Sequence, residues 1–357
     1  MHKRRSITAA AGFAAAALVL AGCAGGGGSE AAPSPAATTA AAGSSDTGCP
    51  MPSSMTTATV ATNPGAQDLV IKHVKDGGFD TKYNLDLQVQ AFQNPPATAQ
   101  AIVQKAVNLG FGGLTTMVQA RSTGADVIMI GALSTPGNGM FVKKDSPIKD
   151  IGDLKGKNVG SFTALNGAIT SIMQAYAQSA YDFNMLKDVN GEVHVAPDAA
   201  LLGLLDQGSL DAVILGVDAT AVQKYEGKYR QIVDLATDFP DEFGFQALYL
   251  GPVTTESYAT EHCGEVRAYA SAIRDAVLDI EKDPKIWETY AEAVGQPEAA
   301  AKSFQDLYGD SFVTDWGKEQ VDGMKKLVST LTPYLDPAFP KEVDPKLFSL
   351  DYPAFED

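Results

Sequence analysis

The chain has 357 residues, of which 45% are hydrophobic, and it carries a formal net charge of −16 at pH 7. This length and hydrophobic content can supply the cores of two lobes of ordinary domain size. The acidic surplus argues against nucleic acid as a partner, because the phosphates would be repelled. It leaves a small anionic ligand open, since local dipoles can hold one in a net-negative protein.

The first 22 residues are typical of a secretory signal peptide. Three basic residues, Lys3, Arg4 and Arg5, precede an Ala/Leu/Val run that is too short for a permanent membrane span. The run ends in Leu-Ala-Gly-Cys at residues 20–23, which resembles the lipobox of bacterial lipoproteins. That resemblance implies cleavage after residue 22 and fatty acylation, such as palmitate, of Cys23. An ordinary signal peptide cut elsewhere, with Cys23 incidental, is the alternative.

Residues 23–50 are built from Gly, Ala, Ser, Pro and Thr without apolar periodicity. Such a segment cannot bury enough surface to offset its ordering entropy, so we expect a flexible tether that spans roughly 25–30 Å. Together with Cys23, it predicts a folded body held at the extracytoplasmic face of the cell membrane by a lipid anchor.

Two further cysteines, Cys49 and Cys263, lie in a chain that is expected to be exported, where disulfides persist. A disulfide between them would pin the start of the body to its far half, and two unrelated thiols are the alternative. The histidines show no metal-like spacing, so no metal site is expected; they are His2, His73, His194 and His262.

From Met55 onward, short apolar runs alternate with segments of helical period, which predicts an α/β fold. Strands are predicted at 55–61, 83–92, 107–113, 126–133, 140–145, 157–162, 192–196, 210–216 and 231–236. Helices are predicted at 65–79, 95–106, 114–124, 167–180 and 198–209. After residue 251 the chain is predicted to be mostly helical to about Leu331, followed by a proline-interrupted tail.

Residues 104–124 and 207–227 align without gaps, with Gly113 on Gly216 and Arg121 on Lys224. Each copy comprises the end of a helix, a strand that finishes in glycine, and a new helix. Two copies of this unit predict two similarly built lobes, each with such a turn at the carboxyl end of its sheet, where α/β proteins bind ligands. Coincidental α/β regularity is the alternative, since the identities are few.

The segment IGDLKGKNVGSFTALNGA, at 151–168, together with GGFDTKYNLDLQV at 77–89 and LGFGGLTTMVQA at 109–120, resembles the type II solute-binding proteins of ABC importers. The resemblance covers about residues 55–295 and is to the branch handling sulfonates, taurine, nitrate and thiamine-precursor pyrimidines. It implies a two-lobed periplasmic-binding-protein fold with a helical C-terminal extension. Lobe I would comprise 51–133 and 246–357, and lobe II 134–245. Crossover strands near 131–141 and 237–249 would serve as hinges.

The resemblance also implies a ligand between the lobes, with walls from both. The first lobe and its crossover would contribute Asn63, Gln93, Gly113, Leu114, Thr115, Ser134, Thr135 and Asn138. The second lobe and the return crossover would contribute Leu165, Asn166, Gly167, Asp218 and Phe245. For each residue the alternative is a capping or turn role. Asp218 either caps its helix or receives an amine or a protonatable ring nitrogen. No Arg or Lys falls in these loops, so the sequence shows no bidentate clamp for a carboxylate ligand.

These features predict a monomeric solute-binding lipoprotein, without a cofactor, that delivers a small polar solute to an ABC permease. A ligand-sensing lipoprotein that signals to a membrane partner is one alternative. The other is an enzyme that is similar to the fungal thiamine-pyrimidine synthase, which carries a cysteine-rich motif and binds pyridoxal phosphate through a lysine. The body has only two cysteines and no GxSxG elbow, which disfavours the enzyme.

Overall fold

A computed structural model describes residues 48–354 of the chain. The signal segment 1–22, Cys23 and most of the expected tether lie outside the described residues. The tether was expected to continue to residue 50, whereas Cys49 is already buried, with 6% of its surface exposed. The folded part therefore begins slightly earlier than expected.

The first sheet has five strands in the order β2-β1-β3-β10-β4. Strands β1 and β2 pair in parallel from Thr56 opposite Leu85 to Thr62 opposite Ala91, and β3 continues this parallel set. Strand β10 comes from late in the chain and runs antiparallel to both of its neighbours. The strand bounds are Thr56–Thr62 (β1), Leu85–Ala91 (β2), Leu109–Gly113 (β3), Val127–Met129 (β4) and Leu250–Thr255 (β10).

The second sheet repeats this plan in the order β7-β6-β8-β5-β9. Strands β7, β6 and β8 are parallel, and β5 is antiparallel to both β8 and β9. Each five-stranded sheet thus has four strands that run in one direction and one inserted antiparallel strand, β10 or β5, that arrives from the other lobe. The bounds are Gly139–Lys143 (β5), Val159–Ser161 (β6), His194–Val195 (β7), Ala212–Ile214 (β8) and Tyr229–Asp234 (β9).

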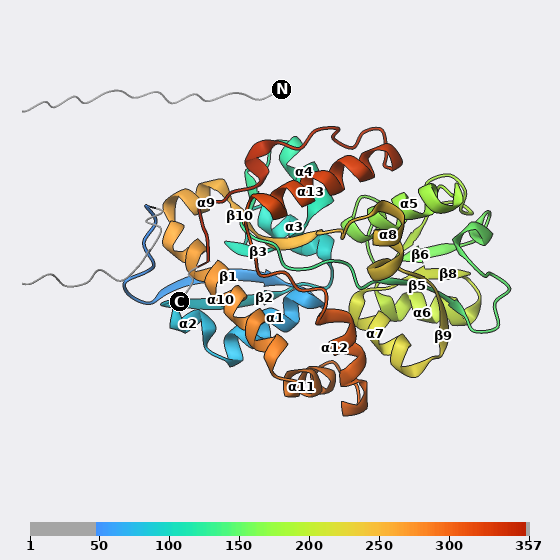
Figure 1. The fold of residues 1–357 in the computed structure, drawn as a ribbon, viewed down its shortest axis with the longest axis horizontal. Helices are drawn as coiled ribbons and strands as arrows, with labels where there is room; N and C mark the ends of the chain where they lie inside the picture. The colour runs from blue at the N-terminus through green and yellow to red at the C-terminus, as the bar shows by residue number, and fades with distance from the viewer. Residues whose placement is uncertain (1–47, 355–357) are drawn as a thin grey trace, which may run out of the picture. The chain divides into compact units, whose positions relative to one another are not determined.

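Helices cover both faces of each sheet (Figure 1). In the first lobe, α1 and α10 share one core, while α3, α4 and α13 join α5 and α8 of the second lobe in another. The helices are Ala66–Asp76 (α1), Phe79–Lys82 (α2), Pro95–Val103 (α3), Leu114–Ser122 (α4), Ala168–Tyr181 (α5), Asp198–Gln207 (α6), Val217–Glu226 (α7), Leu235–Phe243 (α8), Glu256–Glu261 (α9), Cys263–Lys282 (α10), Lys285–Ala293 (α11), Ala301–Tyr308 (α12) and Lys318–Leu331 (α13). Short 3-10 turns occupy Ile151–Leu154, Glu298–Ala300, Thr332–Tyr334 and Pro345–Leu347.

The chain passes between the two sheets at 130–138, after β4, and at 244–249, before β10. The first passage overlaps the expected crossover at 131–138, and residues 139–141 already belong to β5. The second expected crossover began at residue 237, but residues 237–243 belong to α8, which tolerates Pro240 inside it. Asp234 caps this helix by accepting a hydrogen bond from the Ala236 N–H at 3.2 Å, which fixes where it starts.

The repeated unit seen in the sequence is confirmed as a repeated strand-glycine-helix turn. Gly113 links β3 to α4 in the first sheet, and Gly216 links β8 to α7 in the second. Both glycines are helix N-caps. Glycine has no side chain, so neither residue can accept a hydrogen bond from the first backbone N–H groups of α4 or α7.

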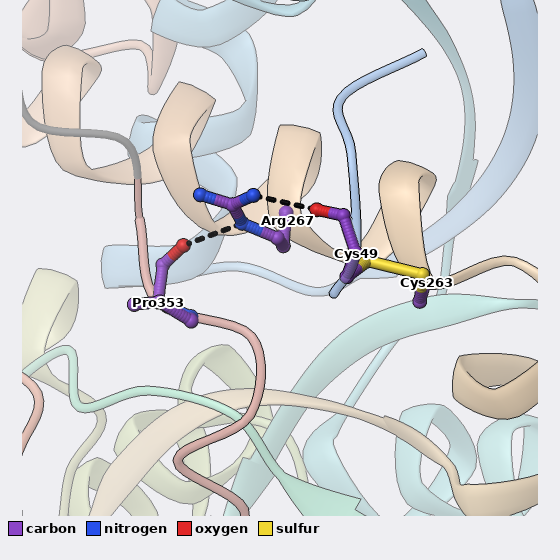
Figure 2. The surroundings of a disulfide bond; sticks show 4 residues. All are labelled: Cys49, Cys263, Arg267 and Pro353. Atoms are coloured by element: carbon purple, nitrogen blue, oxygen red, sulfur yellow. Dashed lines mark hydrogen bonds between the residues drawn. A yellow bond between two sulfur atoms is a disulfide. The ribbon is translucent and has the colours of Figure 1, made fainter. Parts of the chain in front are cut away.

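Cys49 and Cys263 form a disulfide, the pairing expected from the sequence, with 5.7 Å between their Cα atoms (Figure 2). Arg267, one turn further along α10, donates to the Cys49 carbonyl at 2.5 Å and to the Pro353 carbonyl at 3.3 Å. The disulfide and this arginine therefore fix the first described residues and the C-terminal tail to the same helix.

The tail after α13 returns to the edge of the first sheet. The Ser349 N–H donates to the Met129 carbonyl at 3.0 Å, and Arg121 forms an ion pair with Asp344 at 3.0 Å. These contacts attach the C-terminal extension to the first lobe. None of the helices within residues 48–354 is both long enough and apolar enough to span a membrane.

Candidate functional site

A cavity of about 710 Å³ lies between the carboxyl ends of the parallel strands of the two sheets. Its walls include the N-terminal ends of α1, α4 and α5 and the turns that open α3, α6 and α7. The volume falls within the range of small-molecule sites, and the location is where α/β sheets bind ligands.

The structure brings most of the predicted site residues to this cavity. Those that line it are Asn63, Gln93, Gly113, Ser134, Thr135, Asn138, Asn166, Gly167 and Asp218. They come from both lobes and from the first crossover, as the sequence predicted. Asn63 is held rigidly, because its Oδ1 accepts from the Thr98 hydroxyl at 2.9 Å and its Nδ2 donates to the Pro64 carbonyl at 3.0 Å.

Four predicted residues do not line the cavity. Leu114 and Leu165 belong to the core shared by the two lobes, since their side chains pack inward from their turns. Thr115 is buried, and its hydroxyl donates to the Asn166 carbonyl at 2.9 Å. Phe245 packs edge-on against Phe239, with a ring-centroid distance of 5.6 Å, and lies under the ammonium of Lys326.

Sequence reasoning missed several lining residues, among them Thr116, Gln119, Phe162, Thr163, Asp198, Tyr249, Tyr308 and Ser311. The sequence pattern could have identified Thr163 and Asp198, because Thr163 directly follows a predicted strand and Asp198 is the first residue of a predicted helix. Tyr308 and Ser311 gave no such signal, since Tyr308 ends a helix of the C-terminal extension and Ser311 follows that helix, so neither follows a strand of either sheet.

At one end of the cavity, α4 of the first lobe meets the loop before α5 of the second. A Cβ atom added to Gly113 would lie 3.1 Å from the Ala168 Cβ, so this glycine permits the close approach. The hydroxyl of Thr115 donates to Asn166, whose side-chain amide donates in turn to the Gln119 Oε1 at 2.7 Å. The two lobes are thus joined by hydrogen bonds at this end.

At the other end, the side chain of Asp218, in the first turn of α7, contacts residues of the first lobe. Its carboxylate accepts hydrogen bonds from the hydroxyls of Tyr308, at 2.5 Å, and Tyr290, at 3.0 Å. Of the two roles weighed for Asp218 from the sequence, helix capping is not observed, since α7 has no side-chain cap. Burial raises the pKa of Asp218, although the two hydroxyls partly oppose this, and burial beside Asp218 also raises the pKa of both tyrosines.

Asp198, the first residue of α6, lies beside the same turn. Its Oδ1 accepts a hydrogen bond from the Gly216 N–H at 3.0 Å. Burial raises the pKa of Asp198 to about 6, and the charge of Asp218 adds to the effect, while the Gly216 hydrogen bond opposes it. A carboxyl group of this kind is poised to change its charge near neutral pH.

Asn138 in the first crossover reaches the same turn from a third direction. Its Nδ2 donates to the Leu215 carbonyl at 2.9 Å, which orients the amide. The side chain is 1% exposed, and its Oδ1 has no hydrogen-bond partner among residues 48–354. A buried acceptor without a partner is costly, and such a group at a cavity wall points to a missing donor.

The charged residues that line the cavity, within the part of the chain that the structure describes, are Asp198 and Asp218; no Lys, Arg or His lines it. Nor do the described residues gather three His, Cys, Asp or Glu side chains into a candidate metal site. The cavity can therefore bind a solute through amide, hydroxyl, backbone and carboxylate groups.

The family model described as NMT1/THI5 like matches residues 73–286. The chain belongs to this family. The matched range takes in both sheets of the structure, apart from β1, and most of the cavity walls.

Two curated relatives carry names from thiamine metabolism. A Haemophilus influenzae protein named for thiamine biosynthesis is 24% identical over 238 residues, which cover 64% of this chain and 69% of the relative. The 4-amino-5-hydroxymethyl-2-methylpyrimidine phosphate synthase of Schizosaccharomyces pombe is 24% identical over 225 residues, which cover 61% of this chain and 62% of that enzyme.

Solved structures show that this family member has the periplasmic-binding-protein fold. The alkanesulfonate-binding protein of Xanthomonas axonopodis pv. citri, bound to MOPS, has a TM-score of 0.68 at 15% identity and covers 82% of this chain and 97% of its own. The aliphatic sulphonate binding protein of Escherichia coli has a TM-score of 0.64 at 17% identity, with coverages of 84% and 92%. The nitrate-binding protein of Synechocystis PCC 6803 has a TM-score of 0.56 at 15% identity, with coverages of 71% and 69%. At these identities the likeness concerns the fold.

Proposed function

We propose that this protein is the solute-binding lipoprotein of an ABC importer, which captures a small polar organic solute and delivers it to a membrane permease. The observation that carries the proposal is the cavity, which is walled by both sheets and closed at two ends by hydrogen bonds between the lobes. A site of this kind holds a solute by bringing two walls together, as a transport carrier must.

The proposed mechanism is closure by population shift. The lobes, 51–133 with 246–357 and 134–245, would separate by changes in the backbone at 130–138 and 244–249. A solute that contacts both walls favours the closed form, which the permease then recognises. The asparagine at 166, with its hydrogen bonds to both Thr115 and Gln119, would take part in this closure.

The anchoring is proposed on the sequence of the first 50 residues. Cleavage after residue 22 would leave an acylated Cys23 as the first residue, tethered to a monomeric body on the extracytoplasmic face of the cell membrane. Replacing Cys23 by Ser should release the protein from membranes and leave solute binding unchanged. Retention of that variant in the membrane fraction would contradict the lipid anchor.

We propose binding rather than catalysis, although one relative is named a pyrimidine phosphate synthase. The enzyme branch that the sequence resembles binds pyridoxal phosphate through a lysine, and no lysine lines the described cavity. Cys49 and Cys263 are joined in the disulfide, and neither lines the cavity. The residues present therefore do not fit that cofactor.

The proposal is tested by a thermal-shift screen of the full chain in mild detergent. The panel holds sulfonates, taurine, nitrate, aminopyrimidines, aromatic and aliphatic carboxylates, and amino acids. A solute at a hundred times its dissociation constant adds about 2.7 kcal/mol, which raises the Tm by several degrees. Stabilisation by one chemical class supports the proposal, and a flat response across the panel contradicts it.

A matched pair of variants shows whether a stabilising solute occupies the cavity. Gly113→Val places extra atoms against Ala168, where the added Cβ alone would lie at 3.1 Å, and should weaken binding. Gly323→Val in α13 has no heavy atom within 4 Å of its added Cβ and should leave binding unchanged. Equal affinities in the two variants would place the solute elsewhere.

A further inference from the structure

Three acceptor groups converge on one turn at the wall of the cavity. The turn joins β8 to α7 and comprises residues 215–218. Asn138 binds its first carbonyl, that of Leu215, at 2.9 Å, and Asp198 binds the N–H of Gly216 at 3.0 Å. Asp218 is the last residue of the turn and also lines the cavity.

Asp198 and Asp218 give this turn a negative charge, and no Lys, Arg or His among the described residues lines the cavity to neutralise it. The positive end of α7 would ordinarily favour an anion. Here Asp198 already occupies the Gly216 N–H, and Asp218 lies in the first turn of the helix. A sulfonate or nitrate at this turn would face two carboxylates, which is a strongly unfavourable arrangement in a partly desolvated site.

Asn138 gives an independent indication of what is bound. Because its Nδ2 donates to the Leu215 carbonyl, the amide oxygen is the atom that is left for another partner. That Oδ1 is buried without a hydrogen bond among residues 48–354, so it requires a donor. Two carboxylates and one amide oxygen around a single turn are all acceptors, and a group with several N–H donors satisfies them together.

Resting on the proposed function, we propose that this turn is a subsite for a positively charged nitrogen of the solute, such as an amine, amidine or guanidine. Asp198 and Asp218 supply the countercharge, and the Asn138 Oδ1 accepts an N–H from the same group. The hydroxyls of Tyr290 and Tyr308 hold the Asp218 carboxylate toward the first lobe, so a bound cation would be enclosed when the lobes meet. The subsite selects cationic solutes and disfavours the anions that the sulfonate- and nitrate-binding structures are named for.

The test uses three probes of one shape and different charge, benzamidine, benzamide and benzoate, each at about 10 mM with the full chain in mild detergent. Benzamidine should raise the Tm the most, because it alone carries a cationic, multiply donating group. A larger rise with benzoate or benzamide overturns the subsite. A flat response to all three also overturns it, since two carboxylates should bind a small cation measurably at this concentration.

Charge-neutral variants assign the effect to the turn. Asp218→Asn and Asp198→Asn should each weaken benzamidine binding by about ten- to hundredfold and leave benzamide binding within about twofold. Asp241→Asn, an equal charge change on the exposed side of α8, should leave both unchanged. Equal loss of both probes would indicate a structural role. Asp198→Asn keeps an acceptor for Gly216, so it remains informative if Asp218→Asn fails to fold.

The subsite and the proposed function fail separately. If benzamidine does not bind but a sulfonate or carboxylate of the wider panel stabilises the protein, the solute-binding function stands and the cation subsite is wrong. If neither the three probes nor the wider panel stabilises it, both are wrong.

Discussion

The Asp198 carboxyl should destabilise the fold at neutral pH, and its removal should make the protein more stable. In the folded chain its pKa is raised from 3.8 to about 6, mainly by burial. An acid whose pKa is raised on folding does not lower the free energy of unfolding at a pH below its unfolded-state pKa. At a pH above its folded-state pKa it lowers the free energy of unfolding by the full amount. The penalty therefore develops between about pH 4 and pH 6, as the buried group loses its proton.

The magnitude follows from the two pKa values. The difference between 3.8 and about 6 corresponds to about 3 kcal/mol, at 1.36 kcal/mol per pKa unit. Asn is uncharged at every pH and retains an oxygen that can accept the Gly216 N–H. Asp198→Asn should therefore exceed the wild type by up to about 3 kcal/mol in free energy of unfolding at pH 8, and by almost nothing near pH 3.5.

Urea denaturation at pH 8, 6 and 3.5 measures this directly, with Asp241→Asn on α8 as the control for a general charge effect. The control should change the free energy of unfolding by less than about 0.5 kcal/mol at every pH. If Asp198→Asn destabilises the protein at pH 8, or if its effect does not depend on pH, the carboxylate is not under a desolvation penalty and the reasoning fails.

Three further changes follow from contacts elsewhere. Cys263→Ser removes a disulfide that spans 214 residues, so the loop-entropy model predicts a loss of up to about 5 kcal/mol by urea denaturation, and a reductant should then have no further effect. Gly251→Ala would place a Cβ 2.1 Å from the Gly131 carbonyl oxygen and should lower the Tm sharply or prevent folding. In the control Gly203→Ala, within α6, the added Cβ meets no heavy atom within 4 Å, so the free energy of unfolding should rise by about 0.5–1 kcal/mol. Tyr308→Phe removes the 2.5 Å hydrogen bond to Asp218 and should cost about 1–3 kcal/mol in urea, and an unchanged stability would contradict the assigned contact.

Local sequence patterns were enough to predict the parts of the fold that local chemistry determines. The parallel strands and their helices follow from period and turn residues, and Gly113 and Gly216 mark the two equivalent turns at the cavity. Strand β10 escaped prediction because Pro252 lies in its middle, and proline is ordinarily excluded from central strands. Here its missing N–H is tolerated, while its carbonyl accepts the Ile130 N–H at 3.0 Å.

The candidate site shows the same division. Asn63 directly follows a strand and Asp218 lies at the start of a helix; both were predicted to reach the cavity, and both line it. Tyr290 and Tyr308 lie 72 and 90 residues from Asp218, so no local pattern could bring them to it. Phe245 was expected at the cavity because it lies in the return crossover, but an aromatic ring gains more by packing against Phe239 in the core.

The pKa of Asp198 and the proposed cation subsite make a joint prediction about protons. Without a cation, a carboxyl with a pKa of about 6 is partly protonated near pH 6. A bound cation lowers that pKa, so benzamidine binding at pH 6 should release a fraction of a proton into the buffer, and binding at pH 8 should release almost none. Calorimetry at pH 6 in phosphate and in cacodylate, whose ionisation enthalpies differ and whose buffering species are not cations, measures the release as a buffer-dependent heat. Asp198→Asn should abolish that dependence, and a wild-type heat that is the same in both buffers would show that no cation approaches this carboxylate. The proton and the cation compete for the same carboxylate oxygens. Burial disfavours the unpaired Asp198 carboxylate, and a positively charged solute relieves this by pairing with it, so the site prefers such a solute.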